Sequence, residues 1–224
     1  MAFILNIETT TKNCSVSISQ SGKVIACKEI ATQGFAHAEN LHVFITDVLA
    51  QAKLNFTDLD AIAVSQGPGS YTGLRIGVST AKGLCYALDI PLIGIDTLAI
   101  LAHQMLPASG HIVAMLDARR MEVFMGVYTT DYTLAEPIKA EIIDANTLAN
   151  YSGALHLLGD GALKCQEILT DTKFNYYPDI LYPSAQQMGE IAYKKFETGQ
   201  FEDVAYFEPY YLKDFVLTTS NKNS

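Results

Sequence analysis

The stretch Ser65-Gln-Gly-Pro-Gly-Ser-Tyr-Thr-Gly-Leu-Arg-Ile-Gly77 crowds glycines between a short uncharged run, residues 61–65, and a helical pattern, residues 72–87. Glycines at the exit of a buried strand allow unusual backbone angles and the close approach of another group. The stretch is no Walker A loop, because no Gly-Lys-Ser/Thr follows, and Ser70 lacks the frame of a nucleophile elbow. It predicts a strand–loop–helix unit of an α/β protein.

Small residues within this stretch recur every four positions, at Gly69, Gly73, Gly77 and Ala81. On a helix this spacing makes a smooth groove where another element can come very close. Two interpretations stay open: a crossing within the chain, against the sheet or the first helix, or a subunit interface. For the interface, we expect Gly73 and Gly77 to lie on the exposed side of the helix.

The segments before and after this stretch complete a first α/β unit. Residues 3–9, 14–20 and 23–31 are predicted strands, and residues 14–20 alternate apolar side chains with serine at the strand period of two. A helix follows, then the glycine-rich unit, a strand at 91–95, and a helix that ends near Pro107. The apolar face of the first helix consists of Leu41, Phe44, Ile45, Val48, Leu49 and Ala52.

Beyond residues 107–110 the pattern partly restarts. We expect strands at 111–116, 122–128, 139–143 and 155–158, and helices at 145–151, after Gly161, and after Ser184 as far as Gly199. Glu8 and Asp117 hold equivalent places at the end of each first strand. The sequence predicts two related α/β lobes, 1–107 and 108–217, and a disordered tail, 218–224. The alternative is a single α/β domain with coincidentally similar hairpins.

The composition limits the kind of partner. Of 224 residues, 49% are hydrophobic and 17% charged, and the net charge is −9 with an isoelectric point of about 4.9. No basic stripe appears, so the chain is not expected to grip nucleic acid or an anionic membrane by itself. The four cysteines form no CxxC and are expected to be reduced thiols in the cytoplasm. No signal peptide or membrane span is expected.

Three polar turns could approach an anion. Residues 8–11, Glu-Thr-Thr-Thr, end a strand and could hold phosphate through hydroxyls and amides, although a plain polar turn is favoured. Residues 117–120, Asp-Ala-Arg-Arg, carry two cations, and residues 159–161, Gly-Asp-Gly, resemble turns that approach nucleotides. The histidines have no metal-ligand spacing, and sequence order nominates no catalytic triad.

Four segments together resemble one family. They are Asn6-Ile-Glu-Thr-Thr-Thr11, Gln66-Gly-Pro-Gly-Ser-Tyr-Thr-Gly-Leu-Arg-Ile-Gly77, Asp117-Ala-Arg-Arg-x-Glu-Val-Phe124 and Pro209-Tyr-Tyr-Leu-Lys213. Their order is similar to that of the TsaB (YeaZ) family, the glycoprotease-like subunits of bacterial tRNA threonylcarbamoyladenosine biosynthesis. One departure is Lys213, where the family often has arginine.

The resemblance implies an actin/hexokinase-like (ASKHA) fold of two βββαβα-type lobes with mixed sheets. It implies a non-catalytic subunit without a metal, because Thr97 and Leu101 stand where the catalytic paralogue TsaD has its HxxxH histidines. The resemblance also implies that Glu8 stands where active members of the superfamily usually have aspartate. No cofactor is expected beyond vestigial ATP or ADP binding at the degenerate cleft. The candidate cleft residues are Glu8, Thr9, Thr10, Gly159 and Gly161.

The resemblance also implies partners: a heterodimer with TsaD, the ATPase TsaE, and tRNA through the complex only. The helices at about 39–53 and 72–87 are expected to form the contact, or a homodimer of the isolated chain. The candidate interface residues are Leu41, Ile45, Gly69, Gly73, Arg75 and Gly77. The alternatives are a degenerate ATPase or metalloprotease of the same superfamily, or a homodimeric binding or regulatory module.

Overall fold

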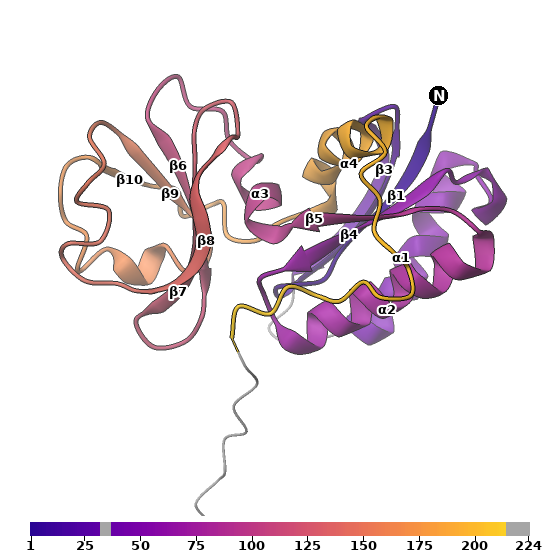
Figure 1. Ribbon diagram of the computed structural model, residues 1–224, viewed down its shortest axis with the longest axis horizontal. Coiled ribbons are helices and arrows are strands. Elements are labelled where there is room, and N and C mark those ends of the chain that lie inside the picture. The colour runs from indigo at the N-terminus through magenta and orange to yellow at the C-terminus, as the bar shows by residue number, and fades with distance from the viewer. Residues whose placement is uncertain (32–36, 214–224) are drawn as a thin grey trace, which may run out of the picture.

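The computed structural model describes residues 1–31 and 37–213 as two mixed sheets with helices around and between them (Figure 1). The first half contains β1 (Phe3–Glu8), β2 (Asn13–Gln20), β3 (Lys23–Ala31), α1 (His37–Ala52), η1 (Phe56–Asp58), β4 (Ala61–Gly67), α2 (Tyr71–Leu88), β5 (Leu92–Asp96) and α3 (Thr97–Ala102). The rest contains β6 (His111–Asp117), β7 (Glu122–Tyr128), β8 (Leu134–Ile142), β9 (Leu155–Leu158), η2 (Leu163–Cys165), β10 (Phe174–Tyr176), η3 (Ala185–Gln187) and α4 (Met188–Glu197).

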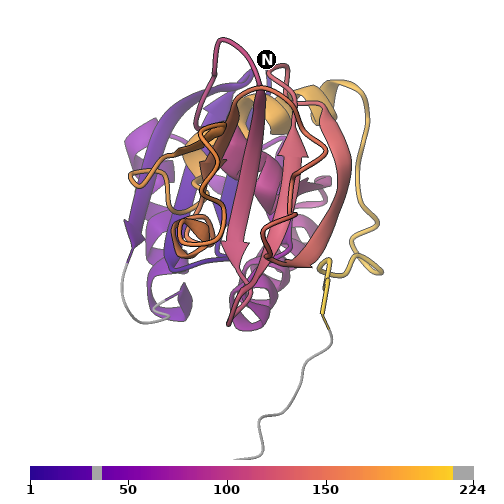
Figure 2. The same ribbon diagram turned by 90° about the vertical axis from the view of Figure 1, so that its left-hand side faces the viewer.

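The two sheets have the same topology. Their strand orders are β3-β2-β1-β4-β5 and, in the corresponding direction, β8-β7-β6-β9-β10. In each sheet the first three strands are antiparallel, and the first strand pairs in parallel with the fourth. Figure 2 shows the second sheet in front of the first half. The predicted internal duplication is confirmed at the level of strand order.

Helices cover both faces of the first sheet. α1 and α2 pack on one face, where the predicted apolar face of α1 is buried in the largest core cluster. On the opposite face, α4 and η3 pack on residues of β1, β4 and β5. α3 lies between the sheets, because Leu98 and Leu101 pack on the second sheet while Ile100 belongs to the core of the first (Figure 1).

The serines of β2 are buried instead of facing solvent. Cys14, Val16 and Ile18 enter the core below α1, while Ser15, Ser17 and Ser19 point to the other face, all at 2% exposure or less. Ser17 Oγ donates to the carbonyl of Ala185 at 2.7 Å, and the Ala185 amide donates to Ser15 Oγ at 3.0 Å. The alternating pattern therefore marks a polar seam that holds η3 to the sheet.

Several predicted elements differ, most of them in the second half. Residues 145–151 form turns, not a helix, and only the short η2 follows Gly161. α3 ends at Ala102, before the predicted end near Pro107, and β10 was not predicted. β8 begins at Leu134, five residues or so earlier than expected. Turns and the short η2 therefore cover the face of the second sheet that corresponds to the face of the first covered by α1 and α2.

α4 belongs to the second half of the sequence, but it packs on the first sheet. Ser184 Oγ accepts from the Gln186 amide at 3.1 Å and starts η3, as predicted for a cap. The division at residue 107 stays a prediction, and the predicted disorder of residues 218–224 lies outside the described residues. In residues 1–31 and 37–213, no helix combines the length and apolar character that crossing a bilayer requires.

Candidate functional site

The glycine-rich segment forms the end of β4, a short loop and the start of α2. The Ser70 side chain accepts from the Gly73 amide at 3.3 Å, and the Ser70 amide donates to the Thr10 carbonyl at 2.7 Å. One residue thus caps the helix and ties it to the turn after β1. The predicted strand–loop–helix unit is confirmed, and its loop rests on the first polar turn.

The glycine stripe of α2 faces the inside of the molecule. A Cβ atom at Gly73 would lie 2.0 Å from the Thr9 carbonyl oxygen, and one at Gly77 would lie 2.4 Å from Thr9 Oγ1. At Gly69 it would lie 2.6 Å from the Thr10 carbonyl. The expectation that Gly73 and Gly77 face outward is wrong, because the helix needs these glycines to approach its own β1–β2 turn.

The apolar residues proposed for the interface are also internal. Leu41 and Ile45 are 0% and 2% exposed and belong to the core between α1 and the first sheet. Of the candidate interface residues, Arg75 alone is exposed, on the outer side of α2. A partner that docks on α1 and α2 therefore contacts side chains other than these candidates. Val43 is 53% exposed and Tyr86 is 86% exposed on these helices.

Glu8 is completely buried at the end of β1. Its Oε1 accepts from the Thr10 amide at 2.6 Å and from the Thr10 hydroxyl at 2.5 Å, while Oε2 has no hydrogen-bond partner among the described residues. Burial disfavours the charged form and raises the pKa of Glu8 to about 7, against the opposing effect of the Thr10 hydrogen bonds. The carboxyl therefore favours a proton at mildly acidic pH.

The second polar turn and the Gly-Asp-Gly turn are bonded to each other. The amides of Gly159 and Gly161 donate to the carbonyls of Ile180 at 2.8 Å and Met115 at 3.1 Å. The Asp117 amide donates to Asp160 Oδ1 at 2.9 Å. Lys164 Nζ donates to the carbonyls of Arg120 and Glu122, each at 2.7 Å, and pairs with Asp117.

These contacts use the groups that would bind phosphate. The Thr10 amide and hydroxyl donate to Glu8, and Thr9 Oγ1 donates to the Gly73 carbonyl at 2.7 Å. The amides of Gly159 and Gly161 likewise already donate to carbonyls within the chain. The five candidate cleft residues thus do not fit a nucleotide phosphate in this conformation, and we assign no nucleotide to them.

The resemblance implies that Thr97 and Leu101 stand at the positions of the paralogue's histidines, and both side chains are buried. Thr97 is buried at the start of α3, and its hydroxyl has no hydrogen-bond partner among the described residues. Leu101 is buried among apolar side chains of the second sheet. In the described part of the chain, no group of three or more His, Cys, Asp or Glu side chains could hold a metal.

A C-terminal strap, residues 200–213, crosses the outside of the first half. The Glu202 amide bonds to the Leu92 carbonyl at 2.9 Å, and the Tyr210 amide bonds to the Gln66 carbonyl at 2.7 Å. Lys82 of α2 donates to the carbonyls of Ala205 at 3.2 Å and Phe207 at 2.8 Å. The strap lies along α2 (Figure 1), and Lys213 at its end pairs with Glu122 of β7.

A groove of about 420 Å³ opens between the strap and α2. It is lined by Arg75, Val78, Ser79, Lys82, Phe207, Glu208, Pro209 and Tyr211. Sequence analysis singled out Arg75 and the segment 209–213 separately but did not predict that they meet. Only the return of the chain after α4 brings the two segments together.

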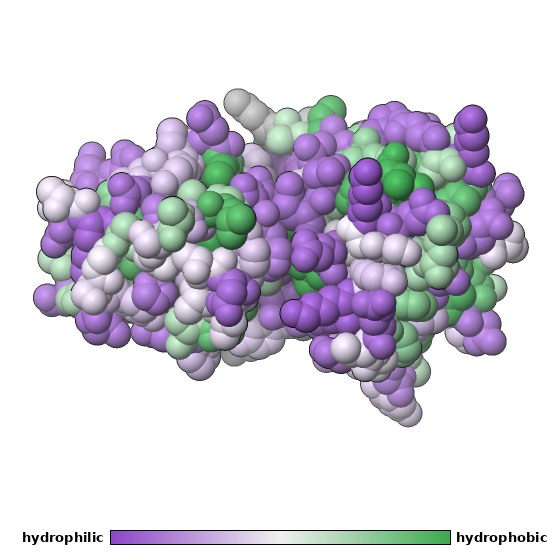
Figure 3. All heavy atoms as spheres, turned by 90° about the horizontal axis from the view of Figure 1, so that it is seen from above, coloured by the Kyte–Doolittle hydropathy of each residue, from purple (hydrophilic) through white to green (hydrophobic). Residues whose placement is uncertain are grey.

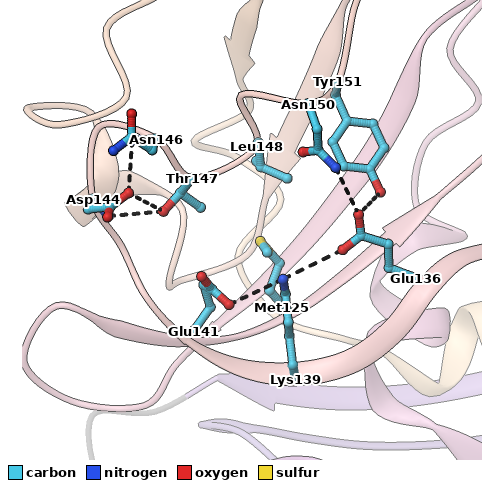
Figure 4. A pocket seen from close by; sticks show the side chains of 10 residues that line it. All are labelled: Met125, Glu136, Lys139, Glu141, Asp144, Asn146, Thr147, Leu148, Asn150 and Tyr151. Atoms are coloured by element: carbon cyan, nitrogen blue, oxygen red, sulfur yellow. Dashed lines mark hydrogen bonds and ion pairs between the residues drawn. The ribbon is translucent and has the colours of Figure 1, made fainter.

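A second pocket, of about 280 Å³, lies on the second half between β8 and the turns at 144–151 (Figure 4). Lys139 Nζ lies 3.5 Å from Glu136 and 3.2 Å from Glu141. The Tyr151 hydroxyl donates to Glu136 at 2.7 Å. The polar groups of this pocket form hydrogen bonds and ion pairs with one another, so we assign no ligand to it.

On the face seen from above, hydrophilic residues dominate between the two halves (Figure 3).

Comparisons with known proteins identify relatives over nearly the whole chain. Residues 29–214 match the family described as TsaD: tRNA N6-adenosine threonylcarbamoyltransferase. The tRNA threonylcarbamoyladenosine biosynthesis protein TsaB of Escherichia coli (strain K12) is 30% identical over 223 residues, 95% of each chain. TsaB of Haemophilus influenzae is 27% identical over 230 residues, 95% of this chain and 94% of that one.

Solved structures agree in fold. YeaZ from Pseudomonas aeruginosa matches with a TM-score of 0.84 and 25% identity over 95% of this chain and 100% of its own. The ethanolamine utilization protein EutJ from Carboxydothermus hydrogenoformans matches with a TM-score of 0.51 and 10% identity over 84% of this chain and 90% of its own, which shows the fold alone. The predicted actin/hexokinase-like α/β fold with two mixed sheets is confirmed.

Proposed function

Because the chain belongs to the TsaB family of tRNA threonylcarbamoyladenosine biosynthesis proteins, we propose that it is the non-catalytic partner subunit of a TsaD transferase. In this role it supports threonylcarbamoyl transfer to the adenosine next to the tRNA anticodon, together with the ATPase TsaE. The observation that carries the proposal is the 30% identity to a TsaB protein over 95% of each chain. We place this activity in the cytoplasm, where tRNA is modified.

The absence of catalytic activity is part of the proposal. It is supported by the bonded polar turns, by the apolar surroundings of Leu101, and by the burial of Thr97. A degenerate ATPase or glycoprotease would need a phosphate cradle, a metal site or an activated nucleophile. Elemental analysis and a nucleotide titration on the pure chain test these alternatives.

We place the contact with TsaD on the outer faces of α1 and α2, in place of the buried glycines. Val43 and Tyr86 project from these helices with 53% and 86% of their surface exposed. Exposed apolar and aromatic side chains are typical anchors of a subunit interface. The same faces would serve a homodimer of the isolated chain.

Reconstitution tests the function directly. Purified TsaD and TsaE are supplied with unmodified tRNA and threonylcarbamoyl adenylate, with and without this chain, and the modified nucleoside is quantified. We expect modification only when the chain is present, and Val43→Asp to weaken binding to TsaD. Full modification without the chain would refute the proposed role.

A further inference from the structure

The groove between α2 and the C-terminal strap has the chemistry of an anion site. Arg75 is exposed, its guanidinium lies 4.2 Å from the centre of the Tyr71 ring, and its Nε donates to the Tyr211 hydroxyl at 3.4 Å. The Tyr71 and Tyr211 rings lie 5.2 Å apart. The aromatic contacts hold the guanidinium without neutralising it, so it remains available to a carboxylate.

The second cation of the groove is also fixed without a carboxylate. Lys82 Nζ donates to two strap carbonyls, which orient the ammonium but leave its charge in place. Among the ion pairs of the described residues, none includes Arg75, Lys82 or the neighbouring Glu208. Apolar surface from Val78, Phe207 and Pro209 completes the walls.

We propose that this groove receives an acidic segment of the TsaD partner, with a side-chain carboxylate held by Arg75 and the charge of Lys82 beside it. The proposal rests on the proposed function, because the partner is the one named there. Guanidinium groups bind carboxylates in a bidentate, charge-assisted geometry. The net charge of −9 repels an acidic segment from most of the surface, whereas the groove holds two fixed cations against the single carboxylate of Glu208, so docking there is selective.

The test is a titration of the purified, full-length chain with the purified partner. Arg75→Gln retains a donor for Tyr211 but loses the charge, and we expect about tenfold weaker binding. Arg75→Lys retains the charge and should recover part of that loss. The difference between Arg75→Gln and the wild type should shrink at about 0.5 M salt, because the charge is screened.

Two further variants serve as controls. Lys139→Gln removes one exposed cation from the second half and should leave the affinity unchanged. Tyr211→Phe keeps the ring beside Arg75 and loses the hydroxyl, so it separates strap packing from the charge contact. Melting curves of each variant verify that the fold is intact.

A crosslinker identifies the occupant. Ser79 is exposed in the groove, and a photoactivatable label on Ser79→Cys should capture an acidic peptide of the partner. A captured neutral or basic peptide overturns the proposal. So does wild-type affinity of Arg75→Gln while Val43→Asp binds weakly, in which case the proposed function stands and the groove is not used. Weaker self-association of Arg75→Gln with unchanged partner binding would assign the groove to a second copy of this chain.

Discussion

Glu8 is a carboxylic acid without access to water, and its surroundings decide which protonation state the fold prefers. It accepts two hydrogen bonds from Thr10, but its second oxygen has no partner among the described residues. A proton on that oxygen removes a buried charge. The burial and the two Thr10 hydrogen bonds of Glu8 therefore suit the neutral carboxylic acid in a closed turn.

The stability of the fold should depend on pH through Glu8. The folded chain holds this proton up to about pH 7, whereas a free carboxyl loses it near 4.5. The folded state thus binds more protons between these values, and stability falls as pH rises through this range, by roughly 3 kcal/mol in total. Denaturant unfolding at several pH values between 4.5 and 8 measures the slope.

Glu8→Gln serves as the matched variant, because its amide oxygen can still accept from Thr10 and it cannot ionise. We expect it to be more stable than the wild type at pH 8 and to lose this part of the pH dependence. Equal slopes for the two proteins would show that another group causes the dependence.

At the scale of elements, α2 contains two glycines in opposite situations. A Cβ at Gly73 would lie 2.0 Å from a backbone oxygen, whereas a Cβ at Gly83 would meet nothing within 4 Å. Gly73→Ala should destabilise the isolated chain by about 2 kcal/mol or more, because neither backbone can move freely. Gly83→Ala should stabilise it by about 0.5–1 kcal/mol through helix propensity. Chemical denaturation measures both, and similar effects for the two would contradict the internal crossing.

The four-residue glycine spacing could predict that another element approaches α2 closely, but not whether that element belongs to this chain or to a partner. Spacing reports which residues share a helix face, and the partner of that face depends on the β1–β2 turn, which is distant in the sequence. In the same way, the serines of β2 gave the correct strand, but their burial depends on η3, about 170 residues away. Local periodicity was sufficient for α1, α2, α4 and most strands, but it missed β10 and the start of β8.

Helix predictions failed where side chains bond to the backbone. Asp144 accepts from the Asn146 amide at 2.8 Å, and its own amide donates to Thr147 Oγ1 at 3.0 Å. Such contacts offer the backbone an alternative to helical hydrogen bonds. Leu148, with a φ of 64°, interrupts the segment further.

Lys82 makes two of the hydrogen bonds that hold the strap to α2. Lys82→Met keeps the stem but loses both bonds to strap carbonyls. We expect the Tyr210 amide, which bonds to Gln66, to exchange its hydrogen about tenfold faster, because local opening becomes easier. Exchange in β1 and β4 should not change. Unaltered exchange at Tyr210 would show that Lys82 does not hold the strap.

At the scale of the whole molecule, one topology occurs twice and has diverged. The strand order is retained in both sheets, whereas two long helices, α1 and α2, pack on the first, and turns and the short η2 take their place on the second. The first half can therefore present helix faces to a partner, and α4 and the strap add elements from the end of the chain to it. The two halves therefore offer different surfaces to a partner, although their sheets have the same topology.

The charge of the whole molecule predicts how it meets tRNA. Acidic side chains number 24 and basic ones 15. Some of the cations already pair with carboxylates, as Lys28 does with Asp47 and Lys164 with Asp117. Affinity for nucleic acid comes mostly from cations that contact phosphates and release counterions, and the excess of carboxylates over cations opposes that contact.

We therefore expect the isolated chain to bind tRNA more weakly than about 100 µM at roughly 0.15 M salt, at the weak end of non-specific binding. Filter binding or a gel shift, repeated after addition of the TsaD partner, measures this. Retention of tRNA only in the presence of the partner fits a subunit that acts through protein contacts. Tight binding by the chain alone would contradict the prediction. A loss of that binding on Arg119→Ala with Arg120→Ala would then locate it at the exposed turn after β6.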